Sequence, residues 1–373
     1  MLSFLKDKPE QLKQGFRLLK EEGKRNQTLN LLKIGVSALE SGNLSIAKSC
    51  FDTALHHIET THAYNKTALQ ARSLWYEEGM KEFKGEPYER AMAYYYRGLI
   101  YMIDGDYENA RACFKSGLLQ DAFAEEQQYK SDFALLLFLE GFCSQKLSDF
   151  DNSSEAYGIL KGYRPDLNFQ PNIINLLIIV ETGTSPRKLS DGIGHAELKY
   201  FRGANFKEER VSVSLNDYHV DAYPIEDIFW QARTRGGRAV DKILKEKVVF
   251  QDTNEKIGSS LTETSSNILP FIAATPIGAI TGGILGLVGV AEMGMANKAR
   301  PMADTRYWDN LPDIVHIAAF NVKPDKYNIT WKYYDINQKP VFQETDVIIV
   351  PQSVDVKSPY IVYKRYGKKM ISQ

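Results

Sequence analysis

The histidines and cysteines are the residues of this chain best suited to hold a metal or act as nucleophiles, and their spacing favours neither role. His56 and His57 are adjacent, so on a helix they point about 100° apart and cannot share one metal ion. His195, His219 and His316 lie in or beside expected strands, without the His-Glu-x-x-His pattern of a zinc site. We therefore expect structural histidines, no metal and no cofactor.

The three cysteines are Cys50, Cys113 and Cys143. They are too few and too far apart for a disulfide framework, and an odd number suits a reducing compartment. Cys50 and Cys113 each precede a phenylalanine at equivalent repeat positions, which indicates small core residues and not catalytic thiols.

Charged residues form two clusters that could carry chemistry. The first surrounds Gly236 and Gly237 and lacks the endings of known phosphate-binding loops, so it indicates a solvated face, with a phosphate or lipid headgroup site as the alternative. Its members are Arg233, Arg235, Arg238, Lys242, Lys245 and Lys247. The second is Asp304, Arg306 and Asp309 beside Trp308, a local charge pair or a weak candidate for a catalytic carboxylate pair. With no complete catalytic pattern, we expect a protein that is not an enzyme.

Charge and length limit the remaining classes. The 373 residues carry 46 Lys and Arg against 47 Asp and Glu, a formal net charge of −1, which argues against nucleic acid as a partner. The length favours two domains. The N-terminal MLSFLKDKPEQLKQGF lacks the apolar stretch of a secretory signal, so we expect a cytoplasmic protein, with membrane association as the alternative.

An internal repeat organises the first half. Gly35, Gly98 and Gly141 are each followed at +16 by an aromatic residue, namely Phe51, Phe114 and Tyr157. In the first two repeats, turn glycines and small residues stand where two helices must approach closely. This pattern resembles the tetratricopeptide repeat (TPR). We expect a TPR-like α-solenoid over residues 1–168, ending near Pro165.

The first helix of each repeat predicts a partner-binding groove. One turn before and after each glycine lie the candidate lining residues Leu32, Val36, Leu39, Tyr95, Leu99, Met102, Phe138 and Phe142. These residues are apolar and aromatic, which favours an apolar or amphipathic helix of a protein partner. The alternative is that the chain's own helices fill the groove.

The second half, residues 169–373, has the alternation of β-strands. Strand patterns occur in residues 172–183, in ELKYFRG, RVSVSL and YHVDAY, and again in DIVHIAAFNV, NITWKYYDI, TDVIIV and YIVYKRY. Between the two blocks, residues 225–297 have a helical pattern. We expect both blocks to form one sheet or sandwich with this helical portion inserted, and hence an α+β fold.

An apolar, glycine-rich segment lies within that insertion. Residues 268–291 carry no charge, and a straight helix of this length would span about 36 Å. Gly278, Gly282 and Gly286 would share one helix face and allow close packing. Three alternatives stay open: a buried hairpin, a membrane span, and a conditional membrane contact.

Several strings resemble a poorly characterised family of bacterial TPR-containing proteins, many of them envelope lipoproteins. The resemblance covers most of residues 70 to 320 and is carried by GEPYERAMAYYYRGLIYMIDGDYENARACFKSGL, GRAVDKIL and ADTRYWDNLPD. It implies a helical repeat domain joined to a β-rich domain without an assigned activity. We therefore expect a non-enzymatic scaffold for protein partners, with a homo-oligomer among its assemblies. A conditionally membrane-inserting, pore-forming protein is the alternative.

Overall fold

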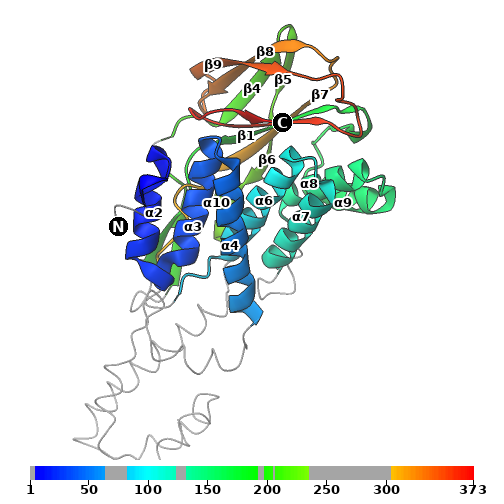
Figure 1. Cartoon of the computed structure of the whole chain (residues 1–373). Coiled ribbons are helices and arrows are strands. Elements are labelled where there is room, and N and C mark those ends of the chain that lie inside the picture. The colour runs from blue at the N-terminus through cyan, green and yellow to red at the C-terminus, as the bar shows by residue number, and fades with distance from the viewer. Residues whose placement is uncertain (1–4, 64–81, 123–131, 192–196, 205, 235–303) are drawn as a thin grey trace, which may run out of the picture.

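The computed structural model describes residues 5–63, 82–122, 132–191, 197–204, 206–234 and 304–373 (Figure 1). The fold is mixed α+β, with helices in the N-terminal part and sheets in the C-terminal part. The segment 268–291, with Gly278, Gly282 and Gly286, lies outside the described residues.

Three helical hairpins form most of the helical layer. After the 3-10 helix η1 (Glu10–Leu12) and α2 (Lys13–Glu21) come the pairs α3 (Gly23–Glu40) with α4 (Leu44–Ala63), α6 (Pro87–Ile103) with α7 (Tyr107–Ala122), and α8 (Ala134–Lys146) with α9 (Phe150–Tyr163). We call α3, α6 and α8 the A helices, and α4, α7 and α9 the B helices. Within each pair the A helix and the B helix pack against each other.

At each repeat glycine of the A helices, an aromatic ring of the paired B helix occupies the space that a side chain would need. A Cβ at Gly35 would lie 2.8 Å from Phe51 Cζ, and one at Gly141 would lie 2.9 Å from Tyr157 Cε1. At Gly98 the Phe114 ring is closer still. These contacts set how closely the two helices of a hairpin approach.

The turns inside the hairpins are built alike. The residue two positions after each A helix has a left-handed backbone, with φ of +79° at Gly42, +78° at Gly105 and +60° at Ser148. The next amide then donates to the carbonyl five residues earlier, as Asn43 N does to Ala38 O at 2.8 Å. This bond ends each A helix and reverses the chain.

The strands form two larger sheets. A five-stranded sheet has the order β11 (Ile371–Ser372), β10 (Tyr360–Arg365), β1 (Leu176–Thr182), β7 (Ile314–Phe320), β6 (Tyr223–Asp227). A four-stranded sheet has the order β5 (Tyr218–Asp221), β4 (Arg210–Leu215), β8 (Lys326–Tyr334), β9 (Pro340–Ile349). The smaller elements are η3 (Pro171–Ile173), the β2 (Arg187–Asp191) and β3 (Glu197–Phe201) ribbon, and α10 (Ile228–Thr234).

Strand β1 lies at the centre of the fold and pairs in parallel with β10 and antiparallel with β7. Each of the two larger sheets therefore combines strands of both blocks. The predicted helical start at Ile225 is wrong, because this residue lies in strand β6 and α10 begins at Ile228.

The molecule has three layers (Figure 1). Alternate residues of β1 point to opposite faces, so Leu177 and Ile179 join the core beneath the helices, whereas Ile178 and Val180 join the core shared with the four-stranded sheet. The helical layer and the five-stranded sheet thus share one hydrophobic core, which continues across the predicted boundary at residue 168.

Candidate functional site

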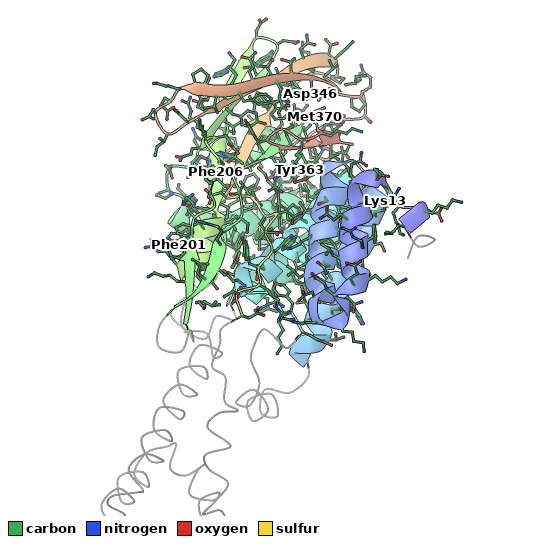
Figure 2. All side chains as sticks on the ribbon, turned by 90° about the vertical axis from the view of Figure 1, so that its left-hand side faces the viewer. Lys13, Phe201, Phe206, Asp346, Tyr363 and Met370 are labelled. Atoms are coloured by element: carbon green, nitrogen blue, oxygen red, sulfur yellow. The ribbon has the colours of Figure 1, made fainter. Side chains whose placement is uncertain are left out.

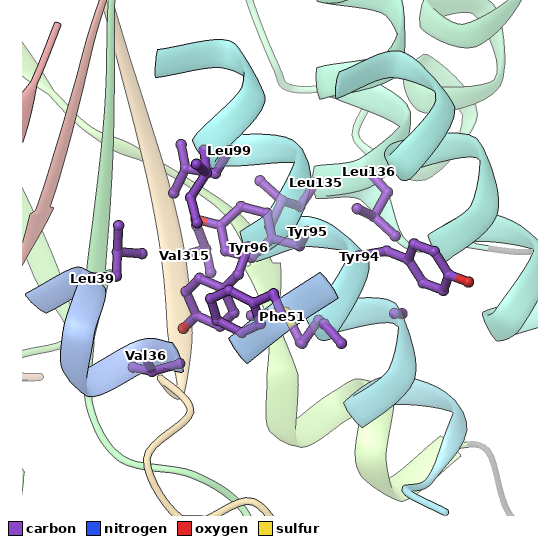
Figure 3. Close-up of a cluster of buried hydrophobic side chains, with 14 of the residues drawn as sticks. Val36, Leu39, Phe51, Tyr94, Tyr95, Tyr96, Leu99, Leu135, Leu136 and Val315 are labelled. Carbon is purple, nitrogen blue, oxygen red and sulfur yellow. The ribbon is translucent and has the colours of Figure 1, made fainter. Parts of the chain in front are cut away.

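The eight residues predicted to line a partner groove are buried. The exposed fraction is 1% for Leu32 and 0% for the other seven, Val36, Leu39, Tyr95, Leu99, Met102, Phe138 and Phe142. Figure 3 shows Val36, Leu39, Tyr95 and Leu99 gathered near Val315 of β7. The structure therefore differs from the prediction of an open groove on this face.

These residues are buried because strand β1 needs cover on both faces. Its sequence LLIIV is apolar at consecutive positions, so both faces of the strand need cover. The four-stranded sheet covers one face, and the apolar faces of the A helices cover the other. The sequence analysis gave as an alternative that the chain's own helices fill the groove. In the structure, strands of the five-stranded sheet occupy this position instead.

A buried polar cluster lies at this interface between helices and sheet. The carboxylate of Glu181 is fully buried and accepts hydrogen bonds from the hydroxyls of Tyr96, at 2.9 Å, and Tyr363, at 3.0 Å. Arg365 Nη1 lies 3.9 Å from Glu181 Oε2 and 2.8 Å from Glu40 Oε1. Burial raises the pKa of Glu181, and the Arg365 guanidinium opposes that rise.

This cluster joins the helical layer to the sheet, and the described residues enclose it. Tyr96 belongs to α6, Glu181 to β1, and Tyr363 to β10, which lies where the sheet meets the helices (Figure 2). All three side chains are fully buried. We therefore assign the cluster a structural role.

An open cavity lies elsewhere, on the part of the helical layer that the sheet does not cover. Its volume is about 290 Å³, and we call it the outer groove. It is lined by Asp52, Leu55, His56 and Glu59 of α4, by Tyr94, Arg97 and Tyr101 of α6, and by Asn109, Ala112, Cys113 and Ser116 of α7. Two consecutive hairpins therefore form it together.

Arg97 is the central charged residue of the outer groove. Its side chain is only 5% exposed, and its Nε donates to Asp52 Oδ1 at 2.5 Å. The guanidinium lies 3.6 Å from the ring centroid of Tyr101, a cation–π contact. Its Nη1 is buried without a hydrogen-bond partner in the described part of the chain. An unpaired buried donor is costly, so the ion pair with Asp52 and the Tyr101 ring must hold this guanidinium in place.

The rim of the outer groove is acidic. Tyr94 points away from Tyr95 and Tyr96 (Figure 3), and its hydroxyl donates to Glu59 Oε1 at 2.8 Å. Asp52 and Glu59 are both exposed on α4. With one guanidinium against two carboxylates, the groove carries a formal charge of −1 when His56 is neutral, which favours a basic or neutral ligand.

The thiol in this groove belongs to Cys113 and is poorly suited to act as a nucleophile. Burial raises the pKa of Cys113 to about 12, so it stays protonated at neutral pH. Burial also raises the pKa of Cys50, to about 11.

Sequence reasoning missed Arg97 and Asp52, although a signal was present. Arg97 directly precedes the repeat glycine Gly98, and Asp52 directly follows the repeat aromatic Phe51. The same two positions form an ion pair between the second and third hairpins, with the charges reversed: Lys115 Nζ lies 3.3 Å from Glu140 Oε1. Oppositely charged residues at these offsets could have predicted contacts between hairpins.

The other predicted residues have structural surroundings or lie outside the described residues. Arg306 forms the predicted local ion pair with Asp304, with Nη2 and Oδ2 2.7 Å apart, whereas Asp309 pairs with Lys33 of α3 at 2.9 Å. Of the basic stretch, only Arg233, in α10, is described. Within the described ranges, no helix is long and apolar enough to cross a membrane.

Comparison with known proteins gives no relative for this chain. No family model, curated protein or solved structure matches it. Its own residues therefore carry the functional argument.

Proposed function

We propose that this protein is a non-enzymatic interaction scaffold of the TPR type that binds a segment of a partner protein in the outer groove. The observation that carries this proposal is the open cavity between α4, α6 and α7, with the exposed carboxylates of Asp52 and Glu59 in its lining. Two features support the TPR assignment and the resemblance to bacterial TPR proteins. In each hairpin a glycine contacts an aromatic ring, and each hairpin turn has a residue with positive φ.

The lining favours an amphipathic helix with basic residues. Asp52 and Glu59 stand seven residues apart on α4, about 10 Å along the helix axis. A partner helix lying along α4 can place Lys or Arg at its own positions i and i+7 against these carboxylates. Leu55 and Tyr101 would contact its apolar residues, as in other complexes where a helix binds a groove.

A displayed library of helical peptides, selected on the purified full chain, tests this function. We expect enrichment of peptides with basic residues seven positions apart, and at least tenfold weaker binding of those peptides to Glu59→Arg. The matched control is Glu108→Arg, at an exposed position of α7 outside the groove lining. Equal affinity for both variants would contradict the outer groove as the binding site.

A further inference from the structure

Strand β9 is the longest outer strand of the two larger sheets. It has ten residues and pairs with β8 on one side, and no described strand lies on its other side. The remaining outer strands offer less backbone for pairing, since β5 has four residues, β11 has two, and β6 contains Pro224 beside a register shift. The outer edge of β9 is therefore the candidate for pairing with a further strand.

The backbone groups of β9 alternate between bonding to β8 and pointing to the outer edge. Val350 N donates to Asp325 O at 2.9 Å, and this bond fixes the alternation, so the even-numbered residues of β9 bond to β8. The odd-numbered residues direct their N–H and C=O groups away from the sheet. They are Gln343, Thr345, Val347 and Ile349. None of them is charged, and all four side chains are exposed.

An open edge of this kind favours a second copy of the same strand. A foreign strand added to β9 presents a new edge of its own, whereas a second β9 covers both edges at once. We propose that β9 pairs antiparallel with β9 of a second copy of this chain about a two-fold axis. The combined sheet contains four strands from each copy and ends at the short strand β5 on both sides.

Two carboxylates exclude the longest registers of this pairing. Glu344 and Asp346 point to the inner face of the sheet, where Lys364 Nζ lies 3.1 Å from Glu344 Oε2 and 3.3 Å from Asp346 Oδ2. An axis at Glu344 or at Asp346 places that carboxylate directly opposite its own copy. An axis at Thr345 places Glu344 opposite Asp346. Like charges directly opposite each other are destabilising.

An axis at Val347 gives the longest overlap without opposed carboxylates. The register shift near Pro340 takes the start of β9 out of the regular ladder, so the pairing uses the end of the strand. Val347 then faces Val347 of the other copy, and Thr345 faces Ile349. The outward N–H and C=O groups of these residues form about six hydrogen bonds across the axis. Val347 and Ile349, with exposed fractions of 47% and 66%, gain cross-strand neighbours.

The expected assembly is a weak dimer. The pairing involves only the end of one strand of each copy, which covers less surface than a stable interface of about 800 Å² per partner. Dimerisation should therefore depend on protein concentration. Strand β9 belongs to the sheet that lies apart from the helical layer (Figure 1), so this inference is independent of the outer groove.

Sedimentation velocity and amide hydrogen exchange of the full chain test the pairing. The wild-type mass should rise from 42.4 kDa toward twice that value as the concentration increases. Over the same range, exchange of the Thr345, Val347 and Ile349 amides should slow, because the dimer gives them acceptors. The exchange measurement needs no variant.

Val347→Pro tests the axis itself. It removes the outward amide at the axis and no bond to β8, and proline is tolerated at such positions of an outer strand. We expect it to weaken dimerisation at least tenfold. The matched control is Gln343→Pro, the same change at an outward amide beyond the overlap, where the opposite carbonyl of Pro351 already accepts from Val354 N at 3.1 Å. This control should dimerise as the wild type does.

Far-UV circular dichroism at low concentration should be the same for both variants and the wild type, because neither amide bonds to β8. A wild type that stays monomeric at every concentration would overturn the pairing and leave the edge to an extended segment of another protein. Equal dimerisation of Val347→Pro and the wild type would place the contact on another surface. An equal loss in both proline variants would overturn the axis at Val347.

Discussion

Gly98 and Gly158 both lie within helices, but the space beside them differs. A Cβ at Gly98 would collide with the Phe114 ring, whereas a Cβ at Gly158 would meet nothing within 4 Å. We expect Gly98→Ala to lower the free energy of unfolding by about 1 to 3 kcal/mol through overpacking. Gly158→Ala should raise it by about 0.5 to 1 kcal/mol, because alanine favours the helix. Urea unfolding at low protein concentration measures both.

The same two variants also test the repeat geometry. If Gly98→Ala were as stable as the wild type, the close contact between α6 and α7 would not exist in solution. A destabilising Gly158→Ala would mean that α9 already contacts something within the monomer.

His316 predicts a pH dependence of stability. Burial in strand β7 lowers its pKa from 6.5 to about 4. The imidazole therefore binds a proton more readily in the unfolded chain than in the folded one. Its contribution to the free energy of unfolding is full above about pH 6.5 and is lost as the pH falls toward 4. His316→Gln should lack this loss, which amounts to up to about 3 kcal/mol.

Urea unfolding at pH 7 and pH 4.5 measures the difference. The control is His219→Gln, the same substitution at an exposed histidine of β5. An identical pH dependence in His316→Gln and the wild type would show that protonation of this imidazole does not oppose folding.

At the residue scale, spacing along the sequence predicted contacts within a hairpin but not contacts between hairpins. Gly98 and Phe114 are 16 residues apart, and the turn between their helices fixes how they meet. Arg97 and Asp52 belong to different hairpins separated by residues 64–86, so only the three-dimensional packing brings them together. The outer groove was missed for the same reason.

At the scale of elements, the ends of the insertion limit what residues 268–291 can do. Strand β6 precedes the insertion and strand β7 follows it, and the two are hydrogen-bonded neighbours, with Asp227 opposite Ile314. A single membrane crossing between them would separate paired strands. A membrane-active role therefore requires an even number of crossings or a surface contact.

Gly282→Leu tests whether this segment packs against protein. If Gly278, Gly282 and Gly286 form a packing face, a leucine at the centre should lower the free energy of unfolding by about 1 to 3 kcal/mol and reduce the soluble yield. We expect this outcome, measured as a lower melting temperature. An unchanged or higher melting temperature, together with wild-type flotation on liposomes, would favour the membrane alternative.

Apolar runs or apolar–polar alternation predicted most strands, and the missed strands lacked both patterns. Strand β2 reads RKLSD and β6 contains Pro224 beside a register shift, so neither has the regular apolar pattern of β1 or β7. Hydrogen bonding to the neighbouring strands β3 and β7, more than their own residue types, stabilises β2 and β6 as strands.

For the whole molecule, the shared core predicts that the two halves do not fold separately. Residues 1–168 alone would expose the apolar face of the A helices, including Leu39, Tyr95 and Leu99, which β1, β7 and β10 cover in the full chain. We expect this fragment to aggregate or to bind a hydrophobic dye, whereas the full chain unfolds in one cooperative transition.

Coexpression of residues 1–168 and 169–373 provides the complementary measurement. The two fragments should copurify as a soluble complex, because the core that joins them buries apolar surface on both. A monomeric, well-folded 1–168 fragment with a sharp melting transition would contradict the shared core. It would also reopen the A-helix face to partners.

The position of β1 also determines when the five-stranded sheet can form during synthesis on the ribosome. Both neighbours of this strand come from the end of the chain, because β7 begins at Ile314 and β10 ends at Arg365. At roughly 5 to 20 residues per second, the ribosome needs about 10 to 40 s after making β1 to supply both. Throughout that interval the nascent helical hairpins carry an uncovered apolar face. We therefore expect a translational pause before β7 and β10 are made to increase aggregation more than a pause near the start of the chain, measured as the insoluble fraction after expression.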